Sequence, residues 1–495
     1  MKRLFSSVCG IALMSAGATA AQLVPADVIS RIDAIAAFAN GTISYEVDVE
    51  VDGDIVLHSI VINDDNLNPI IRQSDGAIVF VSTPQGEFEV DVRGLDSLAF
   101  KLLEDDRQIG TFTVAQDSYV YELRGTAGVI ESNYIAEKVM IEGAGLELGN
   151  SPSFQFSMTY DEIASQGISD YTQGSGRSST MISRMTTENT TSESQGEASS
   201  HALSVSEDTT YIAEWSDILL ADKIAAFQSG DRSLIQREDR VTVSGTSGSA
   251  RSATQATTVD GQTLVFDAIT GASAFNAELA DGALTIQLSG QDLSLKLAGS
   301  VLPFSKTTVA LTGFDTSISV PVIAEQRVAN GEFSLRLDDL SVSDNIWEMF
   351  DSGEALIREP AALVLDIGFG LKLERGLFQA LSDADNNVPA TIEYLDINEV
   401  SLSALGVNLA ANGAVTFDNS NRQPVPQGVL DAEIDGISSL LASLSQIGVL
   451  PPEMMMGARM MMGVMLVPAD GPDSFTSRIE VAPDGTVTAN GIPLQ

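Results

Sequence analysis

The sequence has very few of the side chains that carry most covalent and metal chemistry. Its 495 residues include one cysteine, Cys9, and two histidines, His58 and His201. Cys9 lies in a stretch that we expect to be cleaved off, which would leave a mature chain without disulfides, cysteine nucleophiles or cysteine metal sites. A Ser-His-Asp triad would need one of the histidines, but neither is accompanied by a Gly-x-Ser-x-Gly turn, and a P-loop is missing too. The sequence therefore predicts no enzyme activity, no catalytic residue, no metal site and no cofactor.

Basic side chains are also scarce. The chain has 26 lysines and arginines against 68 aspartates and glutamates, which gives a formal net charge of -42 at pH 7. A field of that sign repels phosphate backbones and anionic lipid headgroups. Nucleic acid is thus excluded as a partner. We interpret the charge as favouring solubility in preference to forming an acidic docking surface.

Long apolar runs are rare as well. After the beginning of the chain, no segment approaches the run of about 18 apolar residues that a membrane-spanning helix needs. Residues 1–20 have the features of a secretory signal: Lys2 and Arg3, an apolar stretch at residues 4–13, and a small-x-small sequence that ends at Ala20. We therefore expect a cleavable signal peptide, export, and a location in a Gram-negative periplasm.

What the sequence has in abundance is alternation between apolar and polar residues. Residues 43–51 alternate in this way, Asp52 and Gly53 can form a tight turn, and residues 55–62 return, which predicts a β-hairpin. The same period of two recurs through the second half of the chain, for example over residues 363–373. One buried and one wet face per strand is typical of antiparallel sheets. We predict a mainly β fold of the β-rich α+β class, with long curved antiparallel sheets of meander or sandwich type capped by a few α-helices.

Three regions are predicted after the signal peptide. Residues 21–170 would hold an N-terminal helix and an antiparallel β region, and residues 261–495 a β-rich region with a methionine-rich helix pair. Residues 171–260 lie between them, and eighteen of the thirty-nine positions at 172–210 are Ser or Thr. That stretch could be a flexible linker or a run of polar strands, and alternating bulkier residues favour strands.

Two back-to-back helices are predicted near the C-terminus. The first has a single apolar stripe over residues 437–447, which Asp435 can cap and Gly448 can end. The second would begin at Pro452, because proline is favoured in the first turn of a helix, and would run to about Leu466. Other helices are predicted at residues 25–39, 215–227, 344–351 and 376–381.

The second helix holds seven of the fourteen methionines of the chain. It is apolar almost all round, so we expect it to be buried as a core helix. A sharper hypothesis is that its flexible side chains contact an acyl chain or a partner helix. The candidate contact residues for this hypothesis are Met454, Met461, Met465, Leu440 and Leu444.

Several long stretches point to one protein family. Residues 341–367 read SVSDNIWEMFDSGEALIREPAALVLDI, residues 456–463 read MGARMMMG, and residues 490–494 read NGIPL. These stretches resemble the bacterial family known as domain of unknown function 2125 (DUF2125). The sequence PADVISRIDAIAAFANG at residues 25–41 is similar to the start of that family, so the similarity would run over essentially the whole mature chain. The resemblance implies an exported protein of unknown activity.

The number of apolar strand faces exceeds what the predicted helices can cover. Roughly twenty strands of ordinary length fit the alternating segments. One helix covers about two strands, because a helix is about 10 Å across and strands lie about 4.8 Å apart. The uncovered faces must then pack on another sheet, which is the default for all-β chains, or line a groove that an apolar ligand fills.

Three functions remain open after these steps. The first is non-enzymatic binding of a hydrophobic ligand, such as a lipid or an acyl chain, or of an envelope protein. The alternative is a self-packed structural or interaction protein with an acidic surface, and the last is a hydrolase that uses carboxylates. A calcium-like run begins at Asp383, but Val388 and Tyr394 occupy the positions that need glycine and glutamate, so we interpret it as a loop.

Overall fold

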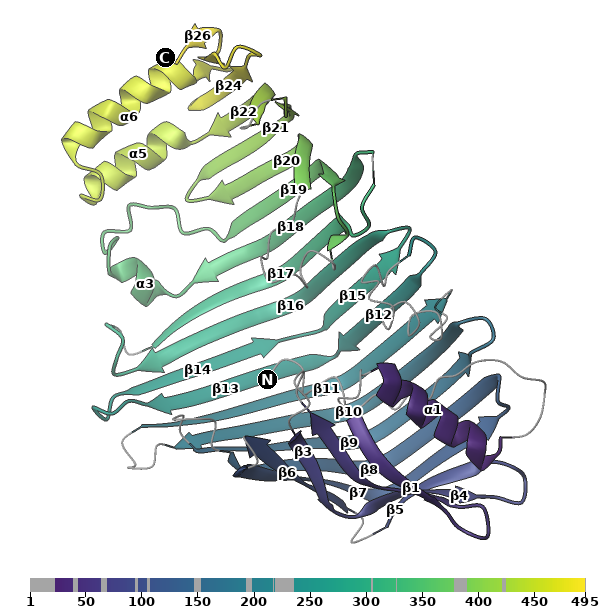
Figure 1. The fold of residues 1–495 in the computed structure, drawn as a ribbon. Coiled ribbons are helices and arrows are strands. Elements are labelled where there is room, and N and C mark those ends of the chain that lie inside the picture. The colour runs from purple at the N-terminus through teal and green to yellow at the C-terminus, as the bar shows by residue number, and fades with distance from the viewer. Residues whose placement is uncertain are drawn as a thin grey trace. The chain divides into compact units, whose positions relative to one another are not determined.

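The fold is dominated by antiparallel β-strands, as Figure 1 shows for this computed structural model. Four helices occur in the part of the chain that the structure describes, so the predicted mainly β class with a few helices is confirmed. None of the described helices is both long and apolar enough to cross a membrane. The described residues are 23–38, 43–63, 69–93, 97–104, 107–146, 153–192, 198–216, 218, 236–303, 306–325, 327–377, 390–420 and 424–494.

Several predictions fall outside these residues. They include the signal peptide at 1–20, the calcium-like run that begins at Asp383, and all but the first two residues of the helix predicted at 376–381. The helix predicted at 215–227 lies mostly outside as well. Its first residue, Trp215, is in a strand, so the predicted helix start is wrong.

The chain divides into two compact units. The N-terminal unit comprises Met1–Leu234 and Glu238–Val265, and the C-terminal unit comprises Ile235–Arg237 and Phe266–Gln495. Strand β14 (Thr263–Thr270) contains the boundary. The division into three regions stays a prediction.

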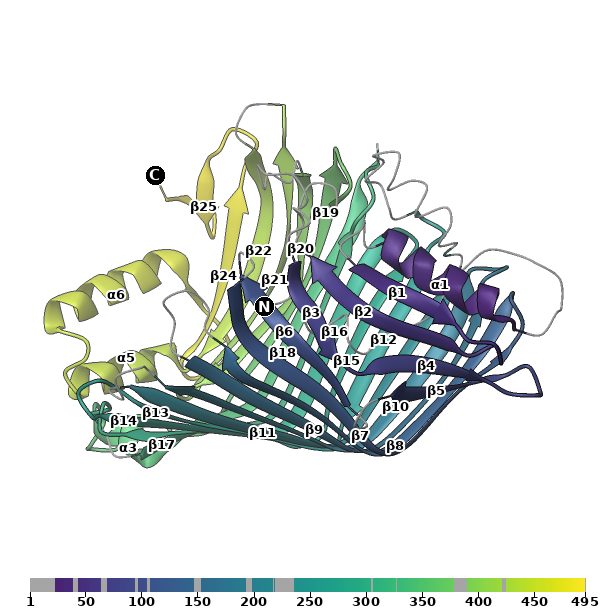
Figure 2. The same ribbon diagram turned by 60° about the horizontal axis from the view of Figure 1, so that its bottom comes forward.

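The N-terminal unit consists of one helix and thirteen strands among its described residues, with every strand pair antiparallel (Figure 2). Its longest strands form a meander from β7 to β11 in which each strand pairs with the next. Both β10 and β11 lie in the Ser/Thr-rich stretch, so the strand interpretation of that stretch is confirmed. The elements are α1 (Pro25–Phe38), β1 (Ile43–Val49), β2 (Ile55–Asn63), β3 (Pro69–Asp75), β4 (Ala77–Ser82), β5 (Phe88–Arg93), β6 (Ser97–Glu104), β7 (Arg107–Gly125), β8 (Val129–Leu146), β9 (Ser153–Asp170), β10 (Ser175–Ser192), β11 (Ser199–Ser216), β12 (Arg240–Ser247) and β13 (Ser249–Thr257).

This unit has a buried core. Val28 of α1 and Ile55 of β2 are fully buried in one hydrophobic cluster, which also includes Phe80 and Phe88. The predicted hairpin of β1 and β2 is confirmed, and its register is fixed by this burial because a slip of one residue would turn Ile55 to solvent. A second, smaller cluster includes Ile163 and lies on β8, β9 and β10.

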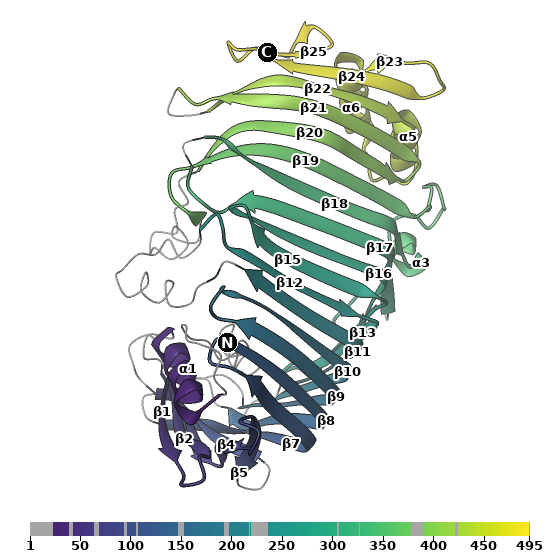
Figure 3. The same cartoon turned by 90° about the vertical axis from the view of Figure 1, so that its right-hand side faces the viewer.

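The C-terminal unit is a meander in which strands β15 to β22 pair in chain order, and Figure 3 shows long bowed ribbons there. Strand β24 then pairs with both β22 and β23. Its helices are α3 (Asp344–Glu348), α5 (Ile437–Gln446) and α6 (Pro452–Met465). Its strands are β15 (Ser273–Ala280), β16 (Ala283–Gly299), β17 (Lys306–Pro321), β18 (Ala329–Val342), β19 (Ala361–Leu373), β20 (Ala390–Ala404), β21 (Val407–Asp418), β22 (Val425–Asp435), β23 (Val467–Pro468), β24 (Ser474–Val481), β25 (Val487–Ala489) and β26 (Ile492–Pro493).

The predicted helix pair is present, but its cap differs. Asp435 does not cap α5, because its carboxylate accepts a hydrogen bond from the Ser474 hydroxyl. The cap is Asp473, whose carboxylate accepts hydrogen bonds from the backbone N–H groups of Ser438 (3.0 Å) and Ser439 (2.8 Å). The capping carboxylate thus comes from a residue 35 positions away from Ser438 in sequence, and not from the adjacent Asp435 that the sequence predicts. Gly448 ends the helix at φ 78°, as predicted.

Aromatic rings fill the space above strand glycines at several cross-strand pairs. Gly370 of β19 pairs with Asn330 of β18 on one side and with Tyr394 of β20 on the other. The Tyr394 ring lies 2.2 Å from where a Gly370 Cβ would be, and its hydroxyl donates a hydrogen bond to Oδ1 of Asn330 at 2.9 Å. The Tyr394 side chain of β20 therefore passes over Gly370 of β19 and reaches Asn330 of β18, so it joins three strands. The same arrangement occurs at Gly143 with Phe156, Gly176 with Trp215, Gly290 with Phe314, and Gly331 with Phe369.

We expect Gly370→Ala to lower the free energy of unfolding by about 1–3 kcal/mol, because the new methyl group would displace the Tyr394 ring. Gly368→Ala is the matched control in the same strand, since the nearest atom to its Cβ lies at an ordinary 3.6 Å. That variant should change stability by less than about 1 kcal/mol. Urea unfolding followed by tyrosine fluorescence measures both, and equal losses would show that the ring crossing does not matter.

Candidate hydrophobic binding surface

One face of the C-terminal sheet is apolar over many adjacent strands. The residues Ile286, Ile318, Phe333, Ile367 and Ile397 lie directly opposite one another across β16 to β20. Neighbouring rows on the same side continue the pattern as far as β24, because successive side chains of a strand alternate between its two sides. Thr316 and Ser477 are polar exceptions on this side. We call this surface the apolar face; it comprises Ile286, Leu288, Ile318, Phe333, Leu335, Leu337, Leu363, Leu365, Ile367, Ile397, Val400, Leu402, Leu409, Ile434 and Phe475.

The opposite side of the same strands is polar. Gln287, Ser317, Ser334 and Asp366 form the row next to the one that contains Ile286, again directly opposite one another. Apolar and polar side chains are thus segregated to the two sides of one sheet. This separation confirms the period of two that the sequence shows in the second half of the chain, for example over residues 363–373.

The apolar face is not covered as a core would be. Ile286, Leu288 and Ile318 are 38 to 45% exposed, and most other members of the face are half-buried. Among the described residues, both clusters of buried hydrophobic side chains lie in the N-terminal unit. A face packed on a second sheet would bury such side chains almost completely. The expectation that the sheet faces pack on one another therefore does not account for this surface.

The residues predicted to contact a ligand or partner lie in the α5–α6 hairpin, at the edge of this sheet (Figure 1). Leu440 and Leu444 of α5 are half-buried, as is Met465 at the end of α6. Met454 and Met461 project into solvent, each 61% exposed. The expectation of a buried core helix is wrong for α6, since Met455 is its only buried residue. The prediction of burial failed because only one side of α6, which includes Met455 and Met465, is shielded from solvent. The nearly uniform apolar composition of the helix does not reveal which side that is.

The family comparison agrees with the resemblance seen in the sequence. A family model described as an uncharacterised protein conserved in bacteria (DUF2125) matches residues 223–495. The chain belongs to this family. The match includes the whole C-terminal unit, and the similarity at residues 25–41 stays a prediction because it lies outside the matched range. A search of curated proteins and a search of solved structures each found no match.

A buried carboxylate organises the longest DUF2125-like motif, and sequence reasoning missed it. Asp351 is fully buried, and its carboxylate accepts hydrogen bonds from the backbone N–H groups of Ala355 (2.8 Å) and Leu356 (3.1 Å). The Arg358 guanidinium donates to the Asp351 carbonyl oxygen at 2.6 Å and lies over the Trp347 ring. Burial alone would raise the pKa of Asp351, but these N–H groups and the arginine outweigh it and hold the pKa below its usual value. These hydrogen bonds of Asp351 hold the loop from residue 351 to residue 358 in place. The signal in the sequence that could have revealed this loop is an aspartate seven positions before an arginine.

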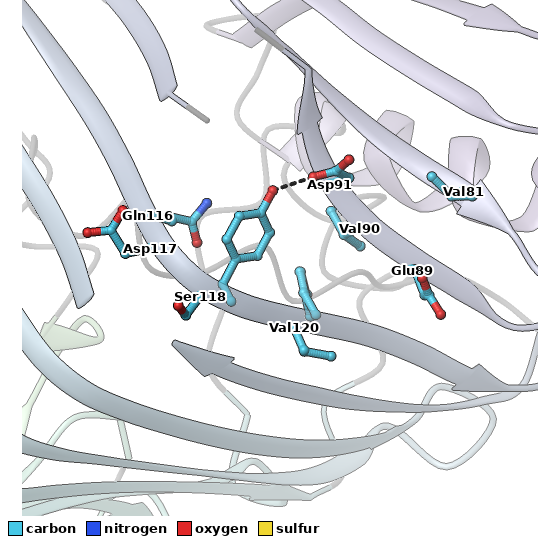
Figure 4. Close-up of a pocket in the computed structure, with 10 residues that line it drawn as sticks. Val81, Glu89, Val90, Asp91, Gln116, Asp117, Ser118 and Val120 are labelled. Carbon is cyan, nitrogen blue, oxygen red and sulfur yellow. Dashed lines mark hydrogen bonds between the residues drawn. The ribbon is translucent and has the colours of Figure 1, made fainter. Parts of the chain in front are cut away.

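The N-terminal unit of this DUF2125 chain contains an open pocket of about 360 Å³ (Figure 4). Strands β4, β5 and β7 form it, and the Tyr119 hydroxyl donates a hydrogen bond of 2.5 Å to the Asp91 carboxylate there. Burial, with a smaller contribution from Tyr171, raises the pKa of the neighbouring Tyr121 to about 12, which keeps that hydroxyl protonated. Glu89, Asp91 and Asp117 make the lining acidic, so it suits an acyl chain less well than the apolar face does.

The structure brings His58 close to a serine and two acids. The Ser59 hydroxyl and the Asp48 carboxylate each lie 3.0 Å from one of the ring nitrogens of His58. The residue types match a Ser-His-Asp triad, but the Ser59 hydroxyl donates its proton to Glu46 at 3.2 Å. A hydroxyl has one proton, so a Ser59 that donates to Glu46 does not donate to His58 as a triad serine must, and the geometry favours a hydrogen-bonding role. His201 likewise has a carboxylate partner, Glu188, at 2.7 Å.

Several described aspartates have a pKa that departs from its usual value. Glycoside hydrolysis by two carboxylates needs one acid with a raised pKa. Each aspartate whose pKa departs from its usual value, in the part of the chain described, has a lowered pKa instead. The Thr172 hydroxyl lowers the pKa of Asp170, and the backbone N–H of Ser420 lowers that of Asp418. The others are Asp351, Asp473 and Asp484.

Proposed function

We propose that this DUF2125 protein is a non-enzymatic carrier that binds the acyl chains of a hydrophobic ligand on its apolar face. The observation that carries the proposal is the exposure of Ile286, Leu288 and Ile318 on β16 and β17, the first two strands of a wide apolar surface. Exposed apolar patches larger than a few hundred Å² are rare on soluble proteins and usually mark an interaction site. Each CH₂ group of a ligand buried there would contribute about 0.8 kcal/mol.

The charge distribution supports a ligand bound through its tail. The positions between the members of the apolar face, such as Thr316, Ala432 and Ser477, are not lysine or arginine either, so they cannot pair with a phosphate or carboxylate headgroup. The formal charge of -42 also disfavours anionic groups close to the protein. The polar end of the ligand would therefore extend into solvent beyond the sheet.

We further propose that the protein acts in the periplasm. The signal-like sequence at residues 1–20 supports this location, as does the absence of thiol chemistry from the rest of the chain. A carrier with an open apolar surface would serve there to move lipids through an aqueous compartment. N-terminal sequencing of the periplasmic protein should give Ala21 as its first residue.

Native mass spectrometry of the protein purified from its own periplasm tests the function directly. We expect an added mass that organic extraction removes and that contains acyl chains. The extracted protein should then bind a fatty-acyl fluorophore saturably at micromolar concentration. A preparation that carries no ligand and does not bind the fluorophore would contradict carriage and favour a structural or interaction role.

A further inference from the structure

The two helices of the C-terminal hairpin differ in the kind of apolar side chain that they use. Helix α5 has three leucines and one isoleucine and no methionine. Helix α6 has seven methionines and neither leucine nor isoleucine. Leucine forms helices at least as well as methionine and defines a core better. Packing therefore does not explain why α6 has methionine where α5 has leucine and isoleucine.

Four of the seven methionines of α6 are exposed to solvent, where filling a core cannot be their role. Met456 and Met460 are 67 and 69% exposed. Residues four apart lie one above the other on a helix, with Cβ atoms about 5–6 Å apart. Methionine has three rotatable side-chain bonds, so both sulfur atoms can reach one point between them. Glu453 lies three positions before Met456, on the same side of the helix and also exposed.

We propose that Met456 and Met460 bind a soft monovalent cation, Cu(I) or Ag(I), through their two thioether sulfurs. Thioethers are soft ligands that select Cu(I) over hard ions such as Mg²⁺ or Ca²⁺. They carry no proton, so binding releases none and needs no deprotonation. The Glu453 carboxylate supplies negative charge beside the ion, and the acidic chain as a whole attracts cations. This site is independent of acyl-chain binding on the apolar face.

The full chain can be titrated with Ag(I), a stand-in for Cu(I) that does not oxidise in air. Isothermal calorimetry should give saturable binding, and the NMR signals of the methionine methyl groups should identify Met456 and Met460. Under anaerobic conditions, the protein should also compete for Cu(I) with a chromophoric chelator. The double variant Met456→Leu/Met460→Leu keeps the apolar surface and the helix but removes the sulfur, and we expect its Kd to rise at least tenfold.

The matched control is Met181→Leu/Met349→Leu, which removes two methionines that are also more than half exposed but lie outside the hairpin. This control should bind Ag(I) as the wild type does. The Met456→Leu/Met460→Leu variant should still bind the fatty-acyl fluorophore, which separates failure of the metal site from failure of the carrier function. Unsaturable Ag(I) binding, or equal weakening in the two double variants, would overturn the proposal.

Discussion

The variant Asp351→Ala should unfold on the order of 10 °C below the wild type, the largest stability effect that we expect from a single substitution. The substitution removes the acceptor for two backbone N–H groups and the carboxylate beside Arg358. The guanidinium of Arg358 would stay largely buried without that carboxylate, and its Nε already has no hydrogen-bond partner. Leaving the largely buried Arg358 guanidinium without its carboxylate destabilises the fold by more than the intact Asp351–Arg358 ion pair stabilises it.

The control for this prediction is Glu354→Gln. Glu354 lies 3.9 Å from Arg358 but is 81% exposed, so its loss should shift the midpoint by less than about 2 °C. Differential scanning calorimetry measures both variants. A fall as large in Glu354→Gln as in Asp351→Ala would contradict the role given to the buried carboxylate.

The effect of Asp351 should depend on pH in one direction. Its pKa is lowered on folding, so its contribution is fully present above the usual carboxyl pKa of about 4 and is lost as the pH falls through the folded value. Wild type and Asp351→Ala should therefore differ most at neutral pH. Their midpoints should converge when the solution is acidified well below about pH 4.

The double variant Ile286→Asp/Ile318→Asp should bind the fatty-acyl fluorophore at least about tenfold more weakly than the wild type. The two residues lie directly opposite each other on β16 and β17 and are among the most exposed members of the apolar face. A ligand chain laid across this row would lose its apolar contacts and would have to desolvate two carboxylates. Fluorescence titration of the extracted protein gives the two dissociation constants.

The same strands provide a control with equal charge. Gln287 and Ser317 are also directly opposite each other, but on the polar side of the sheet. The variant Gln287→Asp/Ser317→Asp has the same cross-strand repulsion and should bind the fluorophore as the wild type does. Equal weakening in both pairs would mean that general destabilisation, and not the apolar face, determines binding.

Much of the fold follows from local patterns. The alternation at residues 43–51 and 55–62 predicts the β1–β2 hairpin, since period two with Asp-Gly between the runs leaves little choice of structure. The structure of the Ser/Thr-rich stretch was harder to predict, because a run of polar residues without an apolar face is compatible with a strand and with a linker. The pairing of β10 with β9 and β11 on both sides decides it.

The candidate sites could be predicted only in part. The sequence indicates α6 as an unusual helix, but the same composition fits a buried helix and an exposed one. His58, Asp48 and Ser59 are brought together by the β1–β2 register and by the positive φ of Ser59, and neither can be seen in a list of residues. The capping of α5 by Asp473 also depends on a contact distant in sequence.

The sequence by itself determined that this protein consists mainly of antiparallel strands with one apolar side, because side chains alternate along any extended chain. Only the tertiary structure decided that the apolar side of β16 to β20 is left open and that four of the seven methionines of α6 face water. The physical reason is that periodicity fixes the direction in which a side chain points. What lies opposite that side chain depends on chain segments that the local pattern does not specify.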